Sequence, residues 1–220
     1  RPNWEAAALL EAQILAQSSP AEALKYMEAY AERYPNAYDL QLQLARSLVG
    51  ERRYADARIC FDRLLQAHPN NPEIIYPVAI LALQQNDLKL AEVQLKHLLN
   101  LDAANKNLAY YYLGQIAEED KRDADALAYF AKVGSGEQFI PAQVRSAQIL
   151  VRQDKIPEAR QLLAKAPAGT EEERVQLIIA EGALLREAKQ IEAAFALLDS
   201  ALKKRPEQPK LQKRPPHPRP

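Results

Sequence analysis

The residues of this sequence that could carry chemistry are few, and they stand far apart. The single cysteine is Cys60, and the three histidines are His68, His97 and His217. A catalytic thiol needs a neighbouring base, and a zinc site needs several His or Cys ligands at short spacing. These histidines have no such spacing to Cys60 or to one another. The sequence therefore predicts no catalytic residue, no metal site and no cofactor.

The acidic residues also lack a pattern that is typical of catalysis. Glu118, Glu119 and Asp120 are consecutive, so on a helix they point in different directions and form a solvated face. The six glycines form no phosphate-binding loop, and the sequence has no nucleophile elbow or dinucleotide fingerprint. We therefore expect a protein that is not an enzyme.

Charge and hydropathy argue against nucleic-acid binding and against a transmembrane segment. The 29 Lys and Arg balance the 29 Asp and Glu, but seven of the basic residues lie from Lys203 onward, so residues 1–202 carry a net charge of −6. Nucleic-acid affinity comes largely from clustered Lys and Arg, so we expect no nucleic-acid binding. The longest apolar run, residues 74–83, falls short of the roughly 20 residues that span a bilayer, so we expect no transmembrane segment.

The compartment follows only coarsely from the sequence. One cysteine excludes an intrachain disulfide, which fits the cytoplasm and also many proteins of the bacterial periplasm. The chain begins with Arg1 and shows no signal peptide, so we interpret it as a processed or excised fragment. We expect a soluble protein of one of these two compartments.

A repeated pattern decides the fold. Six alanines, each followed four residues later by a large apolar residue, lie 33 to 35 residues apart. The alanines are Ala23, Ala57, Ala91, Ala126, Ala159 and Ala194, and the large residues are Met27, Phe61, Leu95, Phe130, Leu163 and Leu198. A second small residue recurs upstream, at Ala45, Ala79, Gly114, Ala147 and Gly182. Helices approach to about 8–10 Å where side chains are small, so these positions indicate crossings within stacked helix pairs.

The pattern resembles the tetratricopeptide repeat (TPR), a helix–turn–helix unit of about 34 residues. The fourth unit carries it most clearly, with Tyr110, Leu113, Gly114, Ala126 and Phe130 in place. In the first unit Glu11 replaces the small residue of the first helix. The resemblance implies an all-α, right-handed superhelical solenoid of about six repeats, in a fragment of a longer bacterial TPR protein.

The repeat register predicts the domains and helices. A TPR domain covers 1–208, with repeats at 4–37, 38–71, 72–106, 107–139, 140–174 and 175–208. First helices are expected at 4–17, 38–51, 72–85, 107–120, 140–153 and 171–187, and second helices at 20–33, 54–67, 88–101, 123–133, 156–165 and 190–204. Pro77 should bend its helix. Residues 209–220 are expected to form a basic, proline-rich, extended tail.

In TPR proteins, ligands usually lie along the concave face lined by the first helices. The resemblance implies a peptide-binding face made by Leu42, Arg46, Tyr76, Ile80, Leu83, Leu108, Tyr111, Gln115, Glu118, Gln148, Arg152 and Arg186. The Lys and Asn set with which chaperone-binding members grip a terminal carboxylate is missing. The face suits an apolar, amphipathic or proline-rich peptide. Packing between adjacent first helices is the alternative role for each of these side chains.

Two functions remain open. The first is a non-catalytic scaffold that binds a protein or peptide on the concave face. The second is a structural segment of a longer solenoid, whose ligand or enzymatic site lies outside this sequence. A further expectation is self-association, through an uncapped C-terminal end or through the proline-rich tail seated in the groove of a neighbouring chain.

Overall fold

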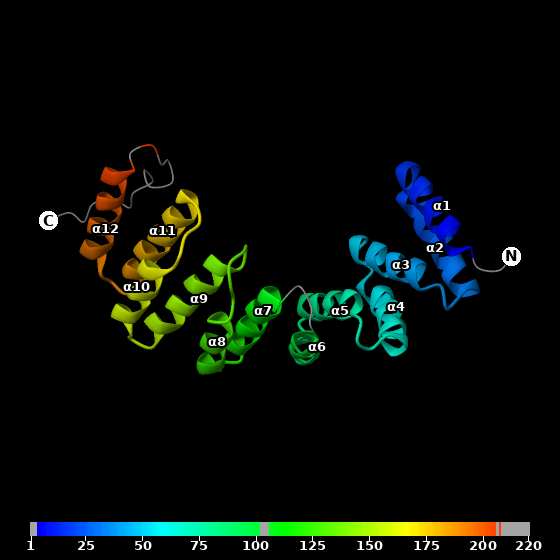
Figure 1. Cartoon of the computed structure of the whole chain (residues 1–220), viewed down its shortest axis with the longest axis horizontal. Helices are drawn as coiled ribbons and strands as arrows, with labels where there is room; N and C mark the ends of the chain where they lie inside the picture. Colours follow the sequence, from blue (N-terminus) through cyan, green and yellow to red (C-terminus); the bar gives the residue numbers. More distant parts are fainter. Residues whose placement is uncertain (1–3, 102–105, 206, 208–220) are drawn as a thin grey trace. The chain divides into compact units, whose positions relative to one another are not determined.

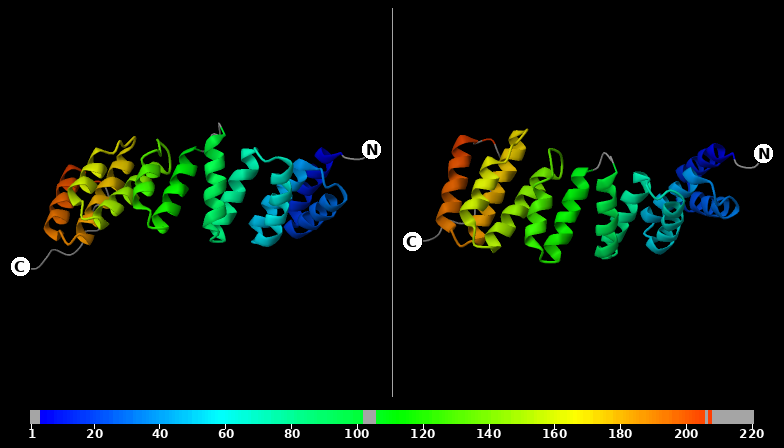
Figure 2. Two further views of the ribbon diagram at one scale, coloured as in Figure 1. Left: turned by 90° about the horizontal axis from the view of Figure 1, so that it is seen from below. Right: turned by 60° about the horizontal axis from the view of Figure 1, so that its bottom comes forward.

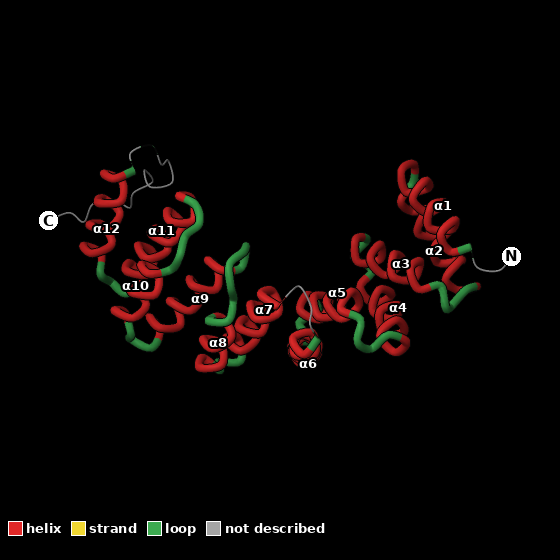
Figure 3. The backbone as a smooth tube through the Cα atoms, in the orientation of Figure 1, coloured by secondary structure: helices red, strands yellow, loops and turns green. Residues whose placement is uncertain are grey.

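The chain folds into helices alone in the part that the computed structural model describes, which is residues 4–101, 106–205 and 207. These residues form twelve α-helices and no strand (Figure 1, Figure 3). The chain divides into two compact units, residues 1–104 (unit 1) and 105–220 (unit 2). The predicted all-α solenoid of helix pairs is confirmed. The predicted tail, 209–220, lies outside the described residues.

The helices form six pairs, and each first helix packs against the second helix that follows it (Figure 2). Unit 1 contains α1 (Glu5–Ser18), α2 (Pro20–Arg33), α3 (Tyr38–Gly50), α4 (Tyr54–Ala67), α5 (Pro72–Gln84) and α6 (Leu88–Asn100). Unit 2 contains α7 (Lys106–Glu119), α8 (Asp123–Phe130), α9 (Phe139–Arg152), α10 (Ile156–Lys165), α11 (Glu171–Glu187) and α12 (Ile191–Lys204). Within each unit, the second helix of a pair also contacts the first helix of the next. Apart from the end of α8, every bound lies within one residue of its prediction.

Five of the six turns inside the pairs share one backbone conformation. Their middle residues are Arg52, Asn86, Lys121, Asp154 and Lys189, all with φ of 59–60°. In each turn the next amide bonds back to a carbonyl near the helix end, as Arg53 N does to Leu48 O at 2.8 Å. This left-handed residue stops the first helix and satisfies a free carbonyl. The first pair differs, because Ser19 alone separates its helices and caps α2 by accepting from Glu22 N.

The small residues of the repeat pattern lie where the two helices of a pair cross. The six alanines of the second helices are each at most 2% exposed. In two pairs the large residue four positions later packs onto the small residue of the first helix, Phe130 on Gly114 and Leu198 on Gly182. A small side chain on one helix therefore makes room for a large one on the other.

Helix α8 ends at Phe130, whereas the sequence predicted a helix to residue 133. The amide of Asn107 holds the following loop, donating to Ser135 O at 3.0 Å and accepting from Gly134 N at 2.9 Å. Gly136 has φ of 133°, a conformation that glycine adopts without a steric penalty. The loop therefore has its own bonding, which replaces the last helical turn.

Pro77 lies inside α5, and the helix runs through it. Its missing donor would bond to the carbonyl of Glu73 in the first turn. Asn71 caps this turn by accepting from Glu73 N at 2.9 Å. The proline therefore costs only one bond near the helix start. A bend at Pro77 stays a prediction.

Candidate functional site

Two of the crevices in unit 1 lie between the first helices of successive repeats. One of them, which we call the Tyr76 crevice, lies between α3 and α5 and has a volume of about 240 Å³. It is lined by Arg46, Val49, Phe61, Tyr76, Pro77, Ile80, Leu81 and Gln84. Three residues expected on the peptide-binding face, Arg46, Tyr76 and Ile80, therefore surround one cavity.

Helical spacing and the repeat pattern build the Tyr76 crevice. Tyr76 and Ile80 are one turn apart on α5, so both side chains lie on the same face. Phe61, the large residue of the second repeat, is fully buried on α4 and forms the floor. The same large residue that packs the helix pair therefore gives the cavity its apolar base.

The rim of this crevice carries polar groups. Arg46 Nη2 lies 4.0 Å from Glu73 Oε2, and the two side chains are 49% and 67% exposed. An exposed ion pair of this kind contributes about 0–1 kcal/mol, so it holds Arg46 only loosely. The guanidinium of Arg46 and the amide of Gln84 therefore offer N–H donors to a ligand in the crevice.

Two other residues expected on the face of unit 1 do not line this crevice. Leu42 is 4% exposed and belongs to the hydrophobic core, because α1 and α2 both pack against α3. Its role in the structure is packing between helices, the alternative to a ligand contact. Leu83 is half-buried on α5 and is absent from the crevice lining.

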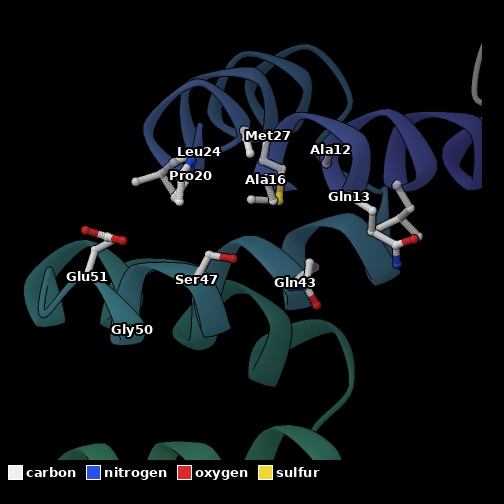
Figure 4. Close-up of a pocket in the computed structure, with 12 residues that line it drawn as sticks. Ala12, Gln13, Ala16, Pro20, Leu24, Met27, Gln43, Ser47, Gly50 and Glu51 are labelled. Atoms are coloured by element: carbon white, nitrogen blue, oxygen red, sulfur yellow. The ribbon is translucent and has the colours of Figure 1, made fainter. Parts of the chain in front are cut away.

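The second crevice, which we call the Met27 crevice, lies between the first helix pair and α3 (Figure 4). Its volume is about 270 Å³. The lining residues are Leu9, Ala12, Gln13, Ala16, Pro20, Ala23, Leu24, Met27, Gln43, Ser47, Gly50 and Glu51. Met27 precedes Phe61 by one repeat, so the two crevices occupy equivalent places in neighbouring repeats. The sequence interpretation missed this crevice. The repeat pattern could have indicated it, because Met27 is the residue of the first repeat that corresponds to Phe61 in the second.

Unit 2 carries a polar cluster on α7 and α9. Glu118 accepts from Arg145 Nη1 at 2.9 Å and from both terminal nitrogens of Arg152 at 3.0 Å. The Gln115 amide lies 3.1 Å from the Tyr111 hydroxyl, and with its oxygen toward Arg145 it accepts from Nε and Nη2 at 3.2 and 3.1 Å. The structure therefore brings together four predicted residues, Tyr111, Gln115, Glu118 and Arg152.

Arg145 links this cluster, and the sequence interpretation did not include it. Burial works against its charge, but hydrogen bonds with Tyr111 and Glu118 outweigh burial and raise the pKa of the guanidinium. Arg145 and Arg152 are seven residues apart, two turns along one face of α9. Glu118 precedes Arg152 by one repeat. This spacing in the sequence indicates that an acidic and a basic side chain can form an ion pair between successive first helices.

The other predicted residues of unit 2 lie outside this cluster. Leu108 is half-buried on α7, and Gln148 is half-buried on α9. Arg186 is exposed in the last turn of α11. Neither Gln148 nor Arg186 takes part in the hydrogen bonds that join Glu118, Arg145 and Arg152.

The cysteine and the two histidines of the described residues contact neighbouring residues of the fold. Burial raises the pKa of the Cys60 thiol, which favours its protonated form. His68 packs edge-on against Tyr38, and His97 lies 3.0 Å from Asn70 Oδ1. Across the described ranges, no three His, Cys, Asp or Glu side chains gather as metal ligands would. None of the helices described is long and apolar enough to cross a membrane.

Comparison with known proteins gives one family. A family model described as tetratricopeptide repeat matches residues 15–76. The TPR repeat-containing protein PA4667 of Pseudomonas aeruginosa is 37% identical over 99 residues, which are 45% of this chain. The match spans 17% of the length of that relative.

Solved structures agree with this chain in fold. PilW, described as a widely conserved type IV pilus biogenesis factor, has a TM-score of 0.64 at 15% identity, over 96% of this chain and 98% of its own. MamA (41-end) from Desulfovibrio magneticus RS-1 scores 0.61 at 23% identity, over 74% and 92%. YrrB, described as a TPR protein with an unusual peptide-binding site, scores 0.59 at 17% identity, over 84% and 95%. The helix pairs and their ladder of small residues form a solenoid with the fold of these TPR structures, and residues 15–76 match the tetratricopeptide repeat model.

Proposed function

We propose that this chain is a non-catalytic scaffold that binds a peptide segment of a protein partner along the first helices of its repeats. The TPR fold in general indicates a protein–protein interaction scaffold. The observation that carries the proposal is the Tyr76 crevice, where an apolar cavity with a polar rim lies among the residues expected to contact a ligand. Binding sites commonly combine an apolar lining with a few polar groups that fix orientation.

The lining of the crevice indicates the chemistry of the ligand. Val49, Phe61, Ile80 and Leu81 offer an apolar surface to one inserted side chain. Burying a Leu or Phe side chain is worth about 1.5–3 kcal/mol, enough to anchor a peptide when several weaker contacts add to it. Donors at the rim, such as the guanidinium of Arg46, would bond to peptide carbonyls. The preferred ligand is therefore an apolar or amphipathic segment.

The polar cluster of unit 2 supports a second contact of different character. Arg145 and Arg152 are 39% and 46% exposed, and Glu118 holds both guanidinium groups in place. Each guanidinium carries five N–H donors, so donors remain for a ligand carbonyl or carboxylate. The similar protein YrrB, which is described as having a peptide-binding site, supports peptide binding on this fold.

Selection from a random dodecapeptide display library on the full chain tests this proposal. We expect enriched peptides with apolar residues, whose affinity falls in Ile80→Ala because Ile80 lines the crevice. Ile59→Ala is the matched control, because Ile59 is 53% exposed on α4 and does not line the crevice. Titration of one enriched peptide onto each variant measures the difference. Equal affinity for both variants, or no enrichment, would count against the crevice.

Two observations support the alternative, in which the chain is a structural segment of a longer solenoid. The matched stretch covers 17% of the length of PA4667. In α1, Leu10 and Ile14 are each 58% exposed, whereas α3, α5, α9 and α11 each contact the second helix of the preceding pair. Under this alternative no peptide would be enriched, and Leu10→Ser with Ile14→Ser would leave the stability of the chain nearly unchanged.

A further inference from the structure

We infer that the Met27 crevice and the Tyr76 crevice together bind one extended peptide segment of a protein partner. The segment places one apolar side chain in each crevice, with a basic residue beside the Met27 crevice and an acidic residue beside the Tyr76 crevice. The inference rests on the proposed function, because it adds a second anchor and a charge pattern to the ligand of the Tyr76 crevice. Both crevices belong to unit 1, so one compact unit holds the whole site.

Helix α3 contributes to both crevices, one on each flank. Gln43, Ser47 and Gly50 line the Met27 crevice, where Ser47 lies opposite the first helix pair in Figure 4. Arg46 and Val49 line the Tyr76 crevice. Because successive helical residues are turned by about 100°, the first three residues cover one arc of α3 and the other two cover the adjacent arc. The two crevices are therefore neighbours, with α3 between them.

Both crevices open on the exposed strip of α3. Asp39, Gln43, Arg46 and Gly50 are exposed, at the four-, three- and four-residue steps of one helix face. Gln43 and Gly50 of this strip belong to the lining of the Met27 crevice, and Arg46 belongs to the lining of the Tyr76 crevice. A segment that crosses the strip can therefore reach both crevices from solvent.

The floors of the two crevices are apolar. Ala12, Ala23 and Met27 are each at most 4% exposed at the Met27 crevice, and Phe61 is fully buried at the Tyr76 crevice. The volumes, about 270 and 240 Å³, are similar. Each crevice therefore offers a buried apolar base to one inserted side chain.

The position of α3 between the crevices sets the spacing of the two anchors. Packed helices lie about 8–10 Å apart, so crevices on the two sides of one helix are separated by about the same distance. A polyproline II segment advances about 3.1 Å per residue and returns to the same face every third residue, or about 9 Å. Two apolar side chains three residues apart therefore match the crevices. The exposed amide of Gln43 can donate to and accept from the backbone between them.

The two linings carry opposite charges. Among the described lining residues, Glu51 is the one charged side chain of the Met27 crevice, and Arg46 is the one charged side chain of the Tyr76 crevice. Both residues are exposed, and Arg46 lies 4.0 Å from Glu73. A ligand carboxylate can replace this long contact with two shorter bonds to the guanidinium. Charge complementarity therefore selects a segment with a basic residue at one end and an acidic residue at the other.

Selection from defined peptide libraries tests the spacing and the charges on the full chain. Each library fixes two leucines, from two to seven residues apart, in an otherwise random dodecapeptide. We expect the strongest enrichment at a separation of three, with a basic residue outside one leucine and an acidic residue outside the other. Glu51→Arg should change the enriched pattern to two acidic residues. The inference is overturned by a preferred separation of seven, which is typical of a helical ligand, by no preferred separation, or by an unchanged charge pattern on Glu51→Arg.

Titration of one enriched peptide by fluorescence anisotropy measures each contact. Ala16→Leu should weaken binding by about tenfold, because Ala16 lines the Met27 crevice and a larger side chain occupies the space of one anchor. Arg46→Gln should weaken binding by about two- to fivefold, and should not affect a peptide whose acidic residue is replaced by glutamine. Glu32→Gln, an exposed residue of α2 outside both linings, is the matched control and should change nothing.

Ile80→Ala, titrated with the same peptide, separates this inference from the proposed function. Weaker binding to Ile80→Ala but not to Ala16→Leu would mean that the Tyr76 crevice alone is the peptide site. The proposed function would then stand, and the inference would be overturned. Unchanged binding to Ile80→Ala would contradict both, and weaker binding to each of the two variants supports both.

Discussion

A β-carbon placed on Gly114 would lie 2.4 Å from Cε1 of Phe130, closer than two such atoms can approach. Phe130 is fully buried, and its ring also contacts Tyr111 at 6.0 Å between centroids. The ring therefore has little room to move away from a methyl group. This contact explains why a small residue on the first helix of a pair accompanies a large residue on the second helix.

Gly114→Ala should therefore destabilise the chain, although alanine is the better helix former by about 1 kcal/mol. We expect a net loss of about 1–3 kcal/mol from overpacking, measured by urea denaturation followed by circular dichroism. Gly182→Ala should cost less, because the nearest atoms, 3.2 Å away, belong to the flexible Leu198 side chain. Gly50→Ala is the control, because nothing lies within 4 Å of its β-carbon and the change should be neutral or stabilising. Equal midpoints for all three variants would contradict this account of the crossings.

The turn residue Lys121 gives a prediction about backbone strain. Its φ is 60°, where an L-residue pays a steric penalty of about 1 kcal/mol that glycine avoids. Lys121→Gly should therefore raise the unfolding midpoint, by about 0.5–1 kcal/mol in free energy. Lys121→Val should lower it, because a β-branched side chain fits this conformation poorly. A lower midpoint for the glycine variant would show that the side chain of Lys121 contributes more than the strain costs.

Most of the fold could be predicted from the sequence because one physical rule repeats along it. Small residues at fixed spacing mark where helices cross, and each crossing places a helix pair. The end of α8 escaped prediction because it depends on Asn107, which reaches the loop after that helix from 27 residues earlier at Gly134. A side-chain contact of this range leaves no periodic signal in the sequence.

The candidate site was predictable only in part. The repeat register tells which face of a helix a residue lies on, but it does not tell which side chains of other helices contact that residue. Tyr76, Ile80 and Arg46, three positions that the register selected, line one crevice. The register also chose Leu42, whose side chain is buried because another helix pair packs on α3. Arg145 was missed because its role depends on Glu118 in the preceding repeat.

The cluster around Glu118 yields a prediction on coupling between repeats. Its side chain is 13% exposed and bonds to both Arg145 and Arg152. Because the two arginines are more than a third exposed, solvent weakens these pairs, and Glu118→Gln should cost about 1 kcal/mol. Glu119→Gln, at an exposed neighbouring position, is the matched control and should cost little. Urea denaturation compares the two variants.

A double-mutant cycle then isolates the contact itself. Glu118→Gln combined with Arg145→Gln should show a coupling energy of about 0.5–1 kcal/mol, because both changes remove the same bond. The pair Glu119→Gln with Arg145→Gln should be additive. Additivity in both cycles would mean that the 2.9 Å contact between Glu118 and Arg145 adds nothing to stability.

Tyr26 gives a prediction on alkaline pH. Its hydroxyl donates to Glu11 Oε2 at 2.8 Å, at the position where other repeats have a small residue. Partial burial and this hydrogen bond raise the pKa of Tyr26 to about 12, because both disfavour the phenolate. The folded chain therefore holds this proton more tightly than the unfolded chain, in which tyrosine titrates near pH 10. The stabilisation is complete below pH 10 and is lost as the pH rises from there through about 12.

The difference in ultraviolet absorbance between the native chain and Tyr26→Phe isolates this group from the other nine tyrosines. We expect the difference curve to show one phenolate transition near pH 12, at the raised pKa of Tyr26. In Glu11→Gln the carboxylate is removed but a hydrogen-bond acceptor remains, so the transition should move toward lower pH because the negative charge no longer opposes the phenolate. Glu22→Gln, an exposed residue on α2 that makes no side-chain bond to Tyr26, is the control and should leave the transition in place. A transition near pH 10 in the native chain would show that Glu11 does not hold the Tyr26 hydroxyl in solution.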